Sequence, residues 1–364
     1  MLRSLVTICG HGGAFPKSAR RLRGSSSVGR PSFGMAFDID GVLVRGQGVL
    51  PGARESLRAL EDARVPFIFV TNGGGCTEEA KAAELTEKLG VEVKRSMVVL
   101  SHSPMRVLAV EFSRKRVMVL GSSAKEIARE DLGLLETVTP EEFAAEWPGI
   151  FHFTGDRYYV KRNFQKRPAE SGRPIPVSAV MVLHDPLDWA LEAQVVVDAP
   201  FGGDPPGSGG PSQTPMFISN PDFVFASVYQ EPRFAAGAFA DTVRMLYSKR
   251  FDTGEPEIEV FGKPTASTFD YARSLLERRS EEIGLAGEVG KLKRIYMVGD
   301  NPSGDIRGAN VAGPPWISNL VKTGVYCDAE GEGNDPIDPA HFVHDHVQDC
   351  VNFAMKQEAT EGGV

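Results

Sequence analysis

The chain of 364 residues is too long for one small core and fits either two domains or one domain with a large insertion. Its hydrophobic content of 41% and charged content of 24% are ordinary for a soluble globular protein. The formal net charge is −8, but residues 1–37 hold six basic side chains and no acid, so residues 38–364 hold 34 basic against 48 acidic side chains, a net charge of −14. This acidic body is a poor candidate for nucleic-acid binding, which needs a concentrated basic face.

The N-terminus has the composition of a targeting segment. Residues 1–32 are rich in Arg and Ser, contain no acid, and open with an apolar run beside a basic residue, namely Leu2, Arg3, Leu5, Val6 and Ile8. We predict mitochondrial targeting by residues 1–32, with the matrix as the destination and a disordered basic tail as the alternative. Four scattered cysteines favour a reducing compartment without a disulfide framework. No run approaches the ~20 apolar residues of a membrane span.

From Phe33 onward, short apolar runs alternate with helical periods. The runs FGMAFDID and VPFIFVTN predict buried strands that end in polar residues, and SMVVLS and KRVMVLG predict further strands. GARESLRALEDAR and TEEAKAAELTEKLG predict amphipathic helices, the second capped by Thr77 and ended by Gly90. We expect the polar side chains of the second helix to form a solvated face, namely Glu78, Glu79, Lys81 and Glu84.

The later part of the chain repeats this alternation after a different middle section. Residues 163–178 and 201–215 are rich in Pro and Gly and predict loops or a flexible surface insertion. Between them, SAVMVLHDPLDWALEAQVVVDAP predicts a strand, a loop, a helix and a second strand. EIEVFGKP and KRIYMVGDN then predict strands around the helix TASTFDYARSLLERR. Alternating strands and helices indicate an α/β fold with a parallel sheet, whose ligands bind at the carboxyl ends of the strands.

Four predicted strand ends carry polar side chains that suit one chemistry. In chain order they are Asp38 with Asp40, Thr71 with Asn72 before Gly73–Gly75, Lys263, and Asp300 with Asp305. If these strands are parallel neighbours, carboxylates, a hydroxyl and an ammonium meet at one edge of the sheet. Clustered carboxylates bind a hard cation such as Mg²⁺. A cation, a lysine and backbone N–H groups are what a transferring phosphoryl group requires.

The order DIDGV, VTN, GKP and GDNPxxDI resembles the haloacid dehalogenase (HAD) superfamily. The 192 residues from Thr71 to Lys263 are similar to subclass IIA, in which a cap is inserted between the second and third motifs. The segments VTNGGG, LSHSPM, HDPLDWALEAQVVVD and VGDNPSGDIRGAN resemble the mitochondrial family of the cat eye syndrome critical region protein. The resemblance implies a HAD-type Rossmann-like core of parallel strands over 33–115 and 236–364, and an inserted α/β cap domain over 116–235.

The resemblance also implies a role for each matching residue. Asp38 is the expected nucleophile and a metal ligand, and Asp40 is the expected general acid and base, with its backbone carbonyl on the metal. Asp300 completes the Mg²⁺ ligands, and Asp305 supports both the metal and Lys263.

The same resemblance assigns the phosphate contacts to the Thr71 side chain, the backbone N–H groups of Asn72 and Gly73, and the Lys263 ammonium. Many subclass IIA phosphatases have TNN followed by Ser or Thr, whereas Gly73–Gly75 follow Asn72 here, which changes the contacts that this loop can make.

Several histidines allow a second interpretation. The segment HFVHDHVQDC suits a zinc site, but it lacks a second ligand cluster, and we favour a solvated helix face for its His341, His344, His346 and Cys350. His102 and His184 are either substrate contacts or histidines satisfied by local hydrogen bonds. Trp189 is expected in the core of the cap.

The sequence therefore predicts a mitochondrial, Mg²⁺-dependent hydrolase of the phosphatase type that forms an aspartyl-phosphate on Asp38. The expected partner is a small phosphorylated metabolite, and a homo-oligomer is compatible with the sequence. One alternative is a phosphotransferase. Another is a binding or assembly protein that keeps the fold without turnover, which the presence of Asp38 and Lys263 disfavours.

Overall fold

The computed structural model describes most of the chain beyond the N-terminal segment. The described residues are 31–147, 149–151, 176–209, 214–225, 229, 231–251, 255–284, 292–326 and 333–361. The predicted targeting segment lies outside them except for its last two residues, as do the predicted loops at 163–175 and 210–213. Across the described residues, the helices are too short or too polar to cross a bilayer.

A six-stranded parallel sheet forms the first half of the fold. Its strand order is β15-β14-β13-β1-β4-β5. The strands are β1 (Phe33–Phe37), β4 (Phe67–Val70), β5 (Val98–Val99), β13 (Arg294–Gly299), β14 (Trp316–Val321) and β15 (Phe342–His344). The nearby helices are α1 (Ala53–Asp62), α2 (Glu78–Leu89), α9 (Ala266–Glu282), α10 (Arg307–Ala312) and α11 (Val347–Glu361). The predicted Rossmann-like core of parallel strands is confirmed.

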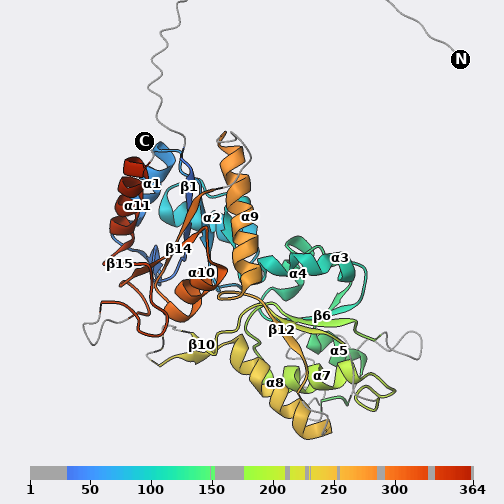
Figure 1. The fold of residues 1–364 in the computed structure, drawn as a ribbon. Coiled ribbons are helices and arrows are strands. Elements are labelled where there is room, and N and C mark those ends of the chain that lie inside the picture. Colours follow the sequence, from blue (N-terminus) through green and yellow to red (C-terminus); the bar gives the residue numbers. More distant parts are fainter. Residues whose placement is uncertain are drawn as a thin grey trace, which may run out of the picture. The chain divides into compact units, whose positions relative to one another are not determined.

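Helices cover both faces of this first sheet. Because side chains alternate along a strand, Met35 and Phe37 of β1 share one apolar cluster with residues of α1, α2 and α11. Ala36, between them, belongs to a separate cluster with residues of α9 and α10. Figure 1 shows α11 and α9 on opposite sides of these strands. The two covered faces leave the carboxyl ends of the strands as the place for a ligand.

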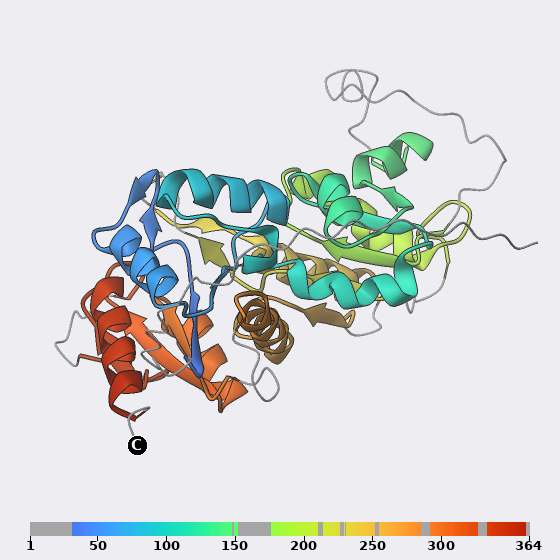
Figure 2. The same cartoon turned by 90° about the horizontal axis from the view of Figure 1, so that it is seen from above.

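A second parallel sheet follows the order β12-β9-β8-β6-β7. Its strands are β6 (Val117–Leu120), β7 (Thr137–Val138), β8 (Ala179–Val182), β9 (Met216–Ile218) and β12 (Ile258–Val260). Its helices are α4 (Ala124–Glu130), α5 (Pro140–Glu146), α7 (Trp189–Phe201) and α8 (Ala236–Phe251). In Figure 2 the blue and red segments gather around the first sheet, and the green segments gather around the second.

Shorter elements complete the described chain. They are the hairpins β2 (Val44–Arg45) with β3 (Gly48–Val49) and β10 (Val224–Phe225) with β11 (Arg233–Phe234), the 3-10 helices η1 (Arg95–Met97) and η2 (Ser103–Leu108), the helix α3 (Ala109–Phe112) and the π-helical turn η3 (Pro302–Ile306). The first hairpin directly follows the DID motif.

The second sheet draws on residues beyond the predicted cap limits of 116–235. Phe239 and Val243 of α8 share an apolar cluster with residues of β6, β8, α5 and α7. β12 pairs with β9 from Ile258 to Val260. We therefore propose that the cap extends over 116–260, because these later elements pair and pack with it.

The predicted helices keep their predicted signals, with one correction in the cap. The Thr77 hydroxyl accepts a hydrogen bond from the Ala80 N–H at the start of α2, and Gly90 ends α2 with φ 68°. The predicted strand in QVVVDAP is wrong, since α7 runs unbroken from Trp189 to Phe201. A wholly apolar run has no periodicity to separate strand from helix, and here Val195 and Val196 are buried within the cap cluster. Residues 202–209 form turns, as predicted.

Candidate active site

Asp38 and Lys263 form a buried ion pair at the carboxyl end of β1. Asp38 follows the last residue of β1 and is 7% exposed, and Lys263 is 4% exposed. The Lys263 ammonium donates to Asp38 Oδ1 at 2.7 Å, to Asp305 Oδ1 at 2.5 Å and to the Val70 carbonyl at 3.0 Å. One ammonium thus joins the ends of β1 and β4 to the turn after β13.

Lys263 reaches this point from the segment that follows β12 of the second sheet, and not from the first sheet. The strand before it, β12, pairs with β9 in the second sheet, so the four motif-bearing strands are not all neighbours in one sheet, although their polar side chains still meet. Asn72 holds the lysine backbone from both sides, because its Nδ2 donates to the Lys263 carbonyl at 2.9 Å and its Oδ1 accepts from the Lys263 N–H at 2.7 Å. These two hydrogen bonds fix the direction in which the Lys263 side chain extends from the backbone.

Asp300 and Asp305 add two carboxylates at the end of β13. The π-helical turn η3 places Asp305 back against the strand end, where its Oδ2 accepts from the Asn301 N–H at 3.1 Å. Asp300 Oδ2 accepts from the Val325 N–H at 2.6 Å. One carboxylate oxygen from each of Asp38, Asp300 and Asp305 lies within 4.8 Å of the others. The expected acidic cluster is therefore present.

Two glycines permit the backbone to approach the Asp300 carboxylate. A Cβ atom on Gly41, which has φ +81°, would lie 2.4 Å from Asp300 Oδ2. A Cβ atom on Gly324 would lie 1.9 Å from the same oxygen. Neither position has room for a larger residue unless Asp300 moves.

The electrostatics of the cluster show an excess of negative charge. Burial, together with the carboxylates of Asp38 and Asp305, raises the pKa of Asp300 to about 8. Burial also raises the pKa of Asp305 to about 6, although Lys263 opposes this rise. Burial alone would lower the pKa of Lys263, but Asp305 and Asp38 raise it above its usual value. Three carboxylates against one ammonium fit a hard divalent cation with oxygen ligands.

Asp40 lies in a different environment from Asp38, two residues away. It is exposed at the start of the turn that leads into β2, where the Gly41 N–H donates to the Val44 carbonyl at 2.8 Å. The surrounding protein still removes part of its hydration, and this burial together with the Asp38 carboxylate raises the pKa of Asp40. The pair thus consists of a buried, lysine-bound carboxylate and an exposed one that holds its proton more tightly than usual.

The loop after β4 brings the remaining predicted residues to the same place. Thr71 is buried, and its Oγ1 accepts from the Gly73 N–H at 2.9 Å. This hydrogen bond occupies the Gly73 N–H that we expected to contact a phosphate. Phosphate binding at Gly73 therefore requires that this hydrogen bond breaks or that the N–H donates to Thr71 Oγ1 and the phosphate at once. Asn72 Nδ2 is committed to the Lys263 carbonyl, which makes Asn72 a clamp on Lys263 in this structure.

Two residues that contact the loop of the site escaped the sequence analysis. Asn220 Nδ2 donates to the Asn72 carbonyl at 3.3 Å, and Asn72 Nδ2 lies 3.3 Å from Asp222 Oδ2. Burial raises the pKa of Asp222, with a further rise from Asp38 and an opposing effect of Asn72 and Lys263. Both residues attach the cap to the loop of the site.

The histidines of the C-terminal segment do not form a zinc site. The described residues contain no group of three or more His, Cys, Asp or Glu with metal-binding spacing besides the aspartate cluster. The favoured solvated helix face is also wrong, because the segment spans the strand β15. His341 Nδ1 lies 2.7 Å from Ser318 Oγ, His344 Nε2 lies 3.3 Å from Asn319 Oδ1, and Cys350 is fully buried in the first-sheet core.

The two other histidines and Trp189 differ in their surroundings. His102 is fully buried and bonded through Nε2 to Asp131 Oδ2 at 2.9 Å, so local satisfaction holds for that nitrogen. His184 packs against the glycine loop, where its ring atoms lie 3.0 Å from the position of a Cβ on Gly75. Trp189 packs on the cap core as predicted.

This arrangement agrees with the family comparisons. A haloacid dehalogenase-like hydrolase model matches residues 35–134, and a second HAD-hydrolase-like model matches residues 260–350. The two matches contain the DID motif and the Lys263 and Asp300 motifs, respectively. The chain belongs to the haloacid dehalogenase-like hydrolases.

Individual relatives extend the likeness over the whole described fold. The mitochondrial hydrolase YKR070W of Saccharomyces cerevisiae is 34% identical over 89% of this chain and 96% of its own. A cardiolipin synthase (CMP-forming) / mitochondrial hydrolase fusion protein of Schizosaccharomyces pombe is 32% identical over 88% of this chain and 53% of its own. The crystal structure of the glycerol phosphate phosphatase Rv1692 from Mycobacterium tuberculosis in complex with magnesium shares the fold, with a TM-score of 0.56 at 20% identity over 88% of this chain and 76% of that one.

Proposed function

We propose that the protein is a Mg²⁺-dependent phosphatase that hydrolyses a small phosphomonoester. The observation that carries this proposal is the buried cluster in which Lys263 bridges Asp38 and Asp305 beside Asp300. The carboxylates of Asp38 and Asp300 and the backbone carbonyl of Asp40 would hold the ion, with Asp305 beside them. When bound, the ion supplies positive charge to the phosphoryl oxygens and to the crowded carboxylates.

Asp38 is the proposed nucleophile. Lys263 holds its Oδ1 at 2.7 Å, which leaves the second carboxylate oxygen to attack phosphorus. A bond forms between this oxygen and phosphorus while the bond to the leaving oxygen breaks, giving an aspartyl-phosphate. Lys263, which stays charged, neutralises the transferring group, and Thr71 Oγ1 lies beside it as a hydrogen-bonding group.

Asp40 suits the two proton transfers. Its raised pKa favours a protonated carboxyl group that can give its proton to the leaving oxygen. The resulting carboxylate then takes a proton from water, whose oxygen attacks phosphorus and breaks the bond to Asp38. Inorganic phosphate leaves, and both carboxyl groups return to their starting states.

The cellular setting follows from the relatives and the N-terminal composition. Both curated relatives carry the words mitochondrial hydrolase in their names. Together with the acid-free segment 1–32, these names support a mitochondrial location, with the matrix as the proposed compartment. A small phosphorylated metabolite is the proposed substrate, consistent with the glycerol phosphate phosphatase that shares the fold.

The test is phosphate release from a panel of phosphomonoesters, with and without Mg²⁺. Asp38→Asn should lower the rate on the order of 10³-fold or more, because it removes the nucleophile. Asp62→Asn, which alters an exposed carboxylate at the end of α1, is the matched control and should keep the rate of the unchanged protein. An unaltered rate in Asp38→Asn, or no release from any ester, would refute the proposal.

A further inference from the structure

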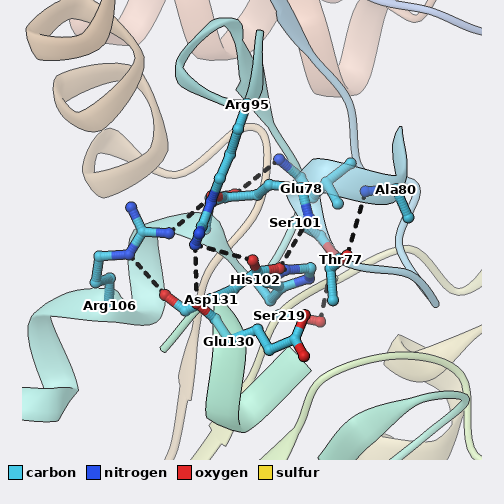
Figure 3. A network of polar contacts seen from close by, with 12 residues as sticks. Thr77, Glu78, Ala80, Arg95, Ser101, His102, Arg106, Glu130, Asp131 and Ser219 are labelled. Carbon is cyan, nitrogen blue, oxygen red and sulfur yellow. Dashed lines mark hydrogen bonds and ion pairs between the residues drawn. The ribbon is translucent and has the colours of Figure 1, made fainter. Parts of the chain in front are cut away.

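A buried polar network lies where the loop of the site enters α2 (Figure 3). Its first member, Glu78, was expected on a solvated helix face, and that prediction is wrong because Glu78 is only 2% exposed. Glu78 Oε2 accepts from Arg95 Nε at 3.0 Å and from Arg106 Nη2 at 2.8 Å. Both arginines come from the segment between α2 and the cap.

Asp131 supplies the contribution of the cap to this network. It follows the last residue of α4 and is 3% exposed. Its Oδ2 accepts from the Glu78 N–H at 2.9 Å, and its Oδ1 accepts from Arg95 Nη2 at 3.1 Å. Its carbonyl accepts from Arg106 Nε at 2.7 Å. One cap residue therefore binds α2, η1 and η2.

His102 completes the contacts of Asp131. The carboxylates of Glu78 and Asp131 pair with the two guanidinium groups, and His102 Nε2 lies 2.9 Å from Asp131 Oδ2. In Figure 3, His102 and Arg95 lie beside Asp131, and the Glu78 carboxylate faces Arg95 and Arg106. The Glu78 and Asp131 carboxylates are buried, and the two arginines that balance their charge are partly exposed, at 40% for the Arg95 side chain and 38% for that of Arg106.

The network is continuous with the loop of residues 71–76. This loop leads through Thr77 directly into Glu78, whose N–H is held by Asp131. On the other side, the residue before His102 is Ser101, whose N–H donates to the Gly73 carbonyl at 3.4 Å. A shift of either Glu78 or His102 therefore moves the backbone of the loop.

We propose that Asp131 is a positioning residue that couples the placement of the cap to the geometry of the loop 71–76. Its carboxylate contacts two segments that are joined to this loop, namely the start of α2 through the Glu78 N–H and the Ser101–His102 turn through His102 Nε2. The catalytic consequence rests on the proposed function of the loop in phosphate binding. The coupling itself is a property of the fold and is measurable without turnover.

Cys76 provides the readout, because it is a free, partly buried cysteine within the loop. Cys350 is free and fully buried in the first-sheet core, far from the loop in sequence, and serves as an internal reference for general unfolding. The full-length protein and its Asp131→Asn variant are treated with a maleimide, and the labelled peptides are separated by mass spectrometry. Glu130→Gln, which alters the exposed neighbour on the same helix, is the matched control.

We expect Asp131→Asn to label Cys76 about 10-fold faster or more while Cys350 stays protected, and Glu130→Gln to behave like the unchanged protein. Once a phosphomonoester that the protein hydrolyses is known, Asp131→Asn should also lower kcat/KM for it by about 10- to 100-fold, since small displacements of positioned groups lower the rate by this much. Unchanged labelling of Cys76, or equal labelling of Cys76 and Cys350, would overturn the proposal in favour of a purely structural role. Absence of any phosphatase activity would refute the proposed function but leave the labelling result valid.

Discussion

Replacement of Lys263 by methionine removes the ammonium that bridges Asp38 and Asp305 while keeping much of the side-chain volume. Three contacts of the ammonium are lost, to Asp38, Asp305 and the Val70 carbonyl. Breaking a buried ion pair by removal of one partner costs about 3–5 kcal/mol, because the remaining charge is buried without compensation. We expect Lys263→Met to lower the free energy of unfolding by this amount at pH 8 in a metal chelator.

The loss should shrink as the pH falls. Without the ammonium, Asp300 and Asp305 hold protons more tightly in the folded state than in the unfolded state. A carboxyl group with a raised folded pKa makes stability decrease as pH rises, since the folded state then binds more protons. The difference in the free energy of unfolding between Lys263→Met and the unchanged protein should therefore decrease as the pH is lowered from 8 to 5.

Urea unfolding at several pH values, followed by circular dichroism, measures both effects. Lys249→Met, which removes an exposed ammonium near the end of α8, is the control and should change stability little. A loss of less than about 1 kcal/mol at pH 8 would match an exposed ion pair and refute the reasoning. A loss that grows as the pH falls would equally contradict it.

Three further outcomes follow from the structure. In chelator, the unchanged protein should lose stability from pH 5 to pH 8.5, because the pKa values of Asp305 and Asp300 are raised to about 6 and about 8, and added Mg²⁺ should flatten this slope in urea titrations. Gly324→Ala should weaken Mg²⁺ binding in calorimetry without unfolding the protein, because its Cβ would displace the Asp300 carboxylate; binding equal to that of the unchanged protein would contradict this. Thr139→Ala should lower the free energy of unfolding by about 1 kcal/mol in thermal unfolding, because it removes the capping box with Glu142 at the start of α5; an unchanged stability would show that this capping box contributes nothing.

The first sheet and the acidic end of the site were predictable from local patterns. The run FGMAFDID gave β1 followed by Asp38, and Thr77 with Gly90 set the limits of α2, because caps and strand ends depend on neighbouring residues alone. The motif GDNPxxDI likewise placed Asp300 and Asp305 after β13.

The remainder depended on pairing between distant segments. The strand before Lys263 joined the second sheet, and nothing in EIEVFGKP distinguishes one parallel sheet from another. Glu78 has the polar character of a solvated residue and became buried only because Arg95 and Arg106 lie beside it. The cap contacts of Asp131, Asn220 and Asp222 depend on tertiary structure, which a single sequence does not display.

The long separation between Asp38 and Lys263 has a consequence for the newly made chain. The two residues are 225 positions apart, and the cap lies between them. When the DID motif emerges from the ribosome, Lys263 has not yet been synthesised. The nascent chain therefore carries Asp38 without the ammonium that pairs with it in the folded protein. The Asp38–Lys263 ion pair can form only after the chain has completed the cap and returned from it. Incomplete translation products are therefore expected to be inactive, however well their first strands are made.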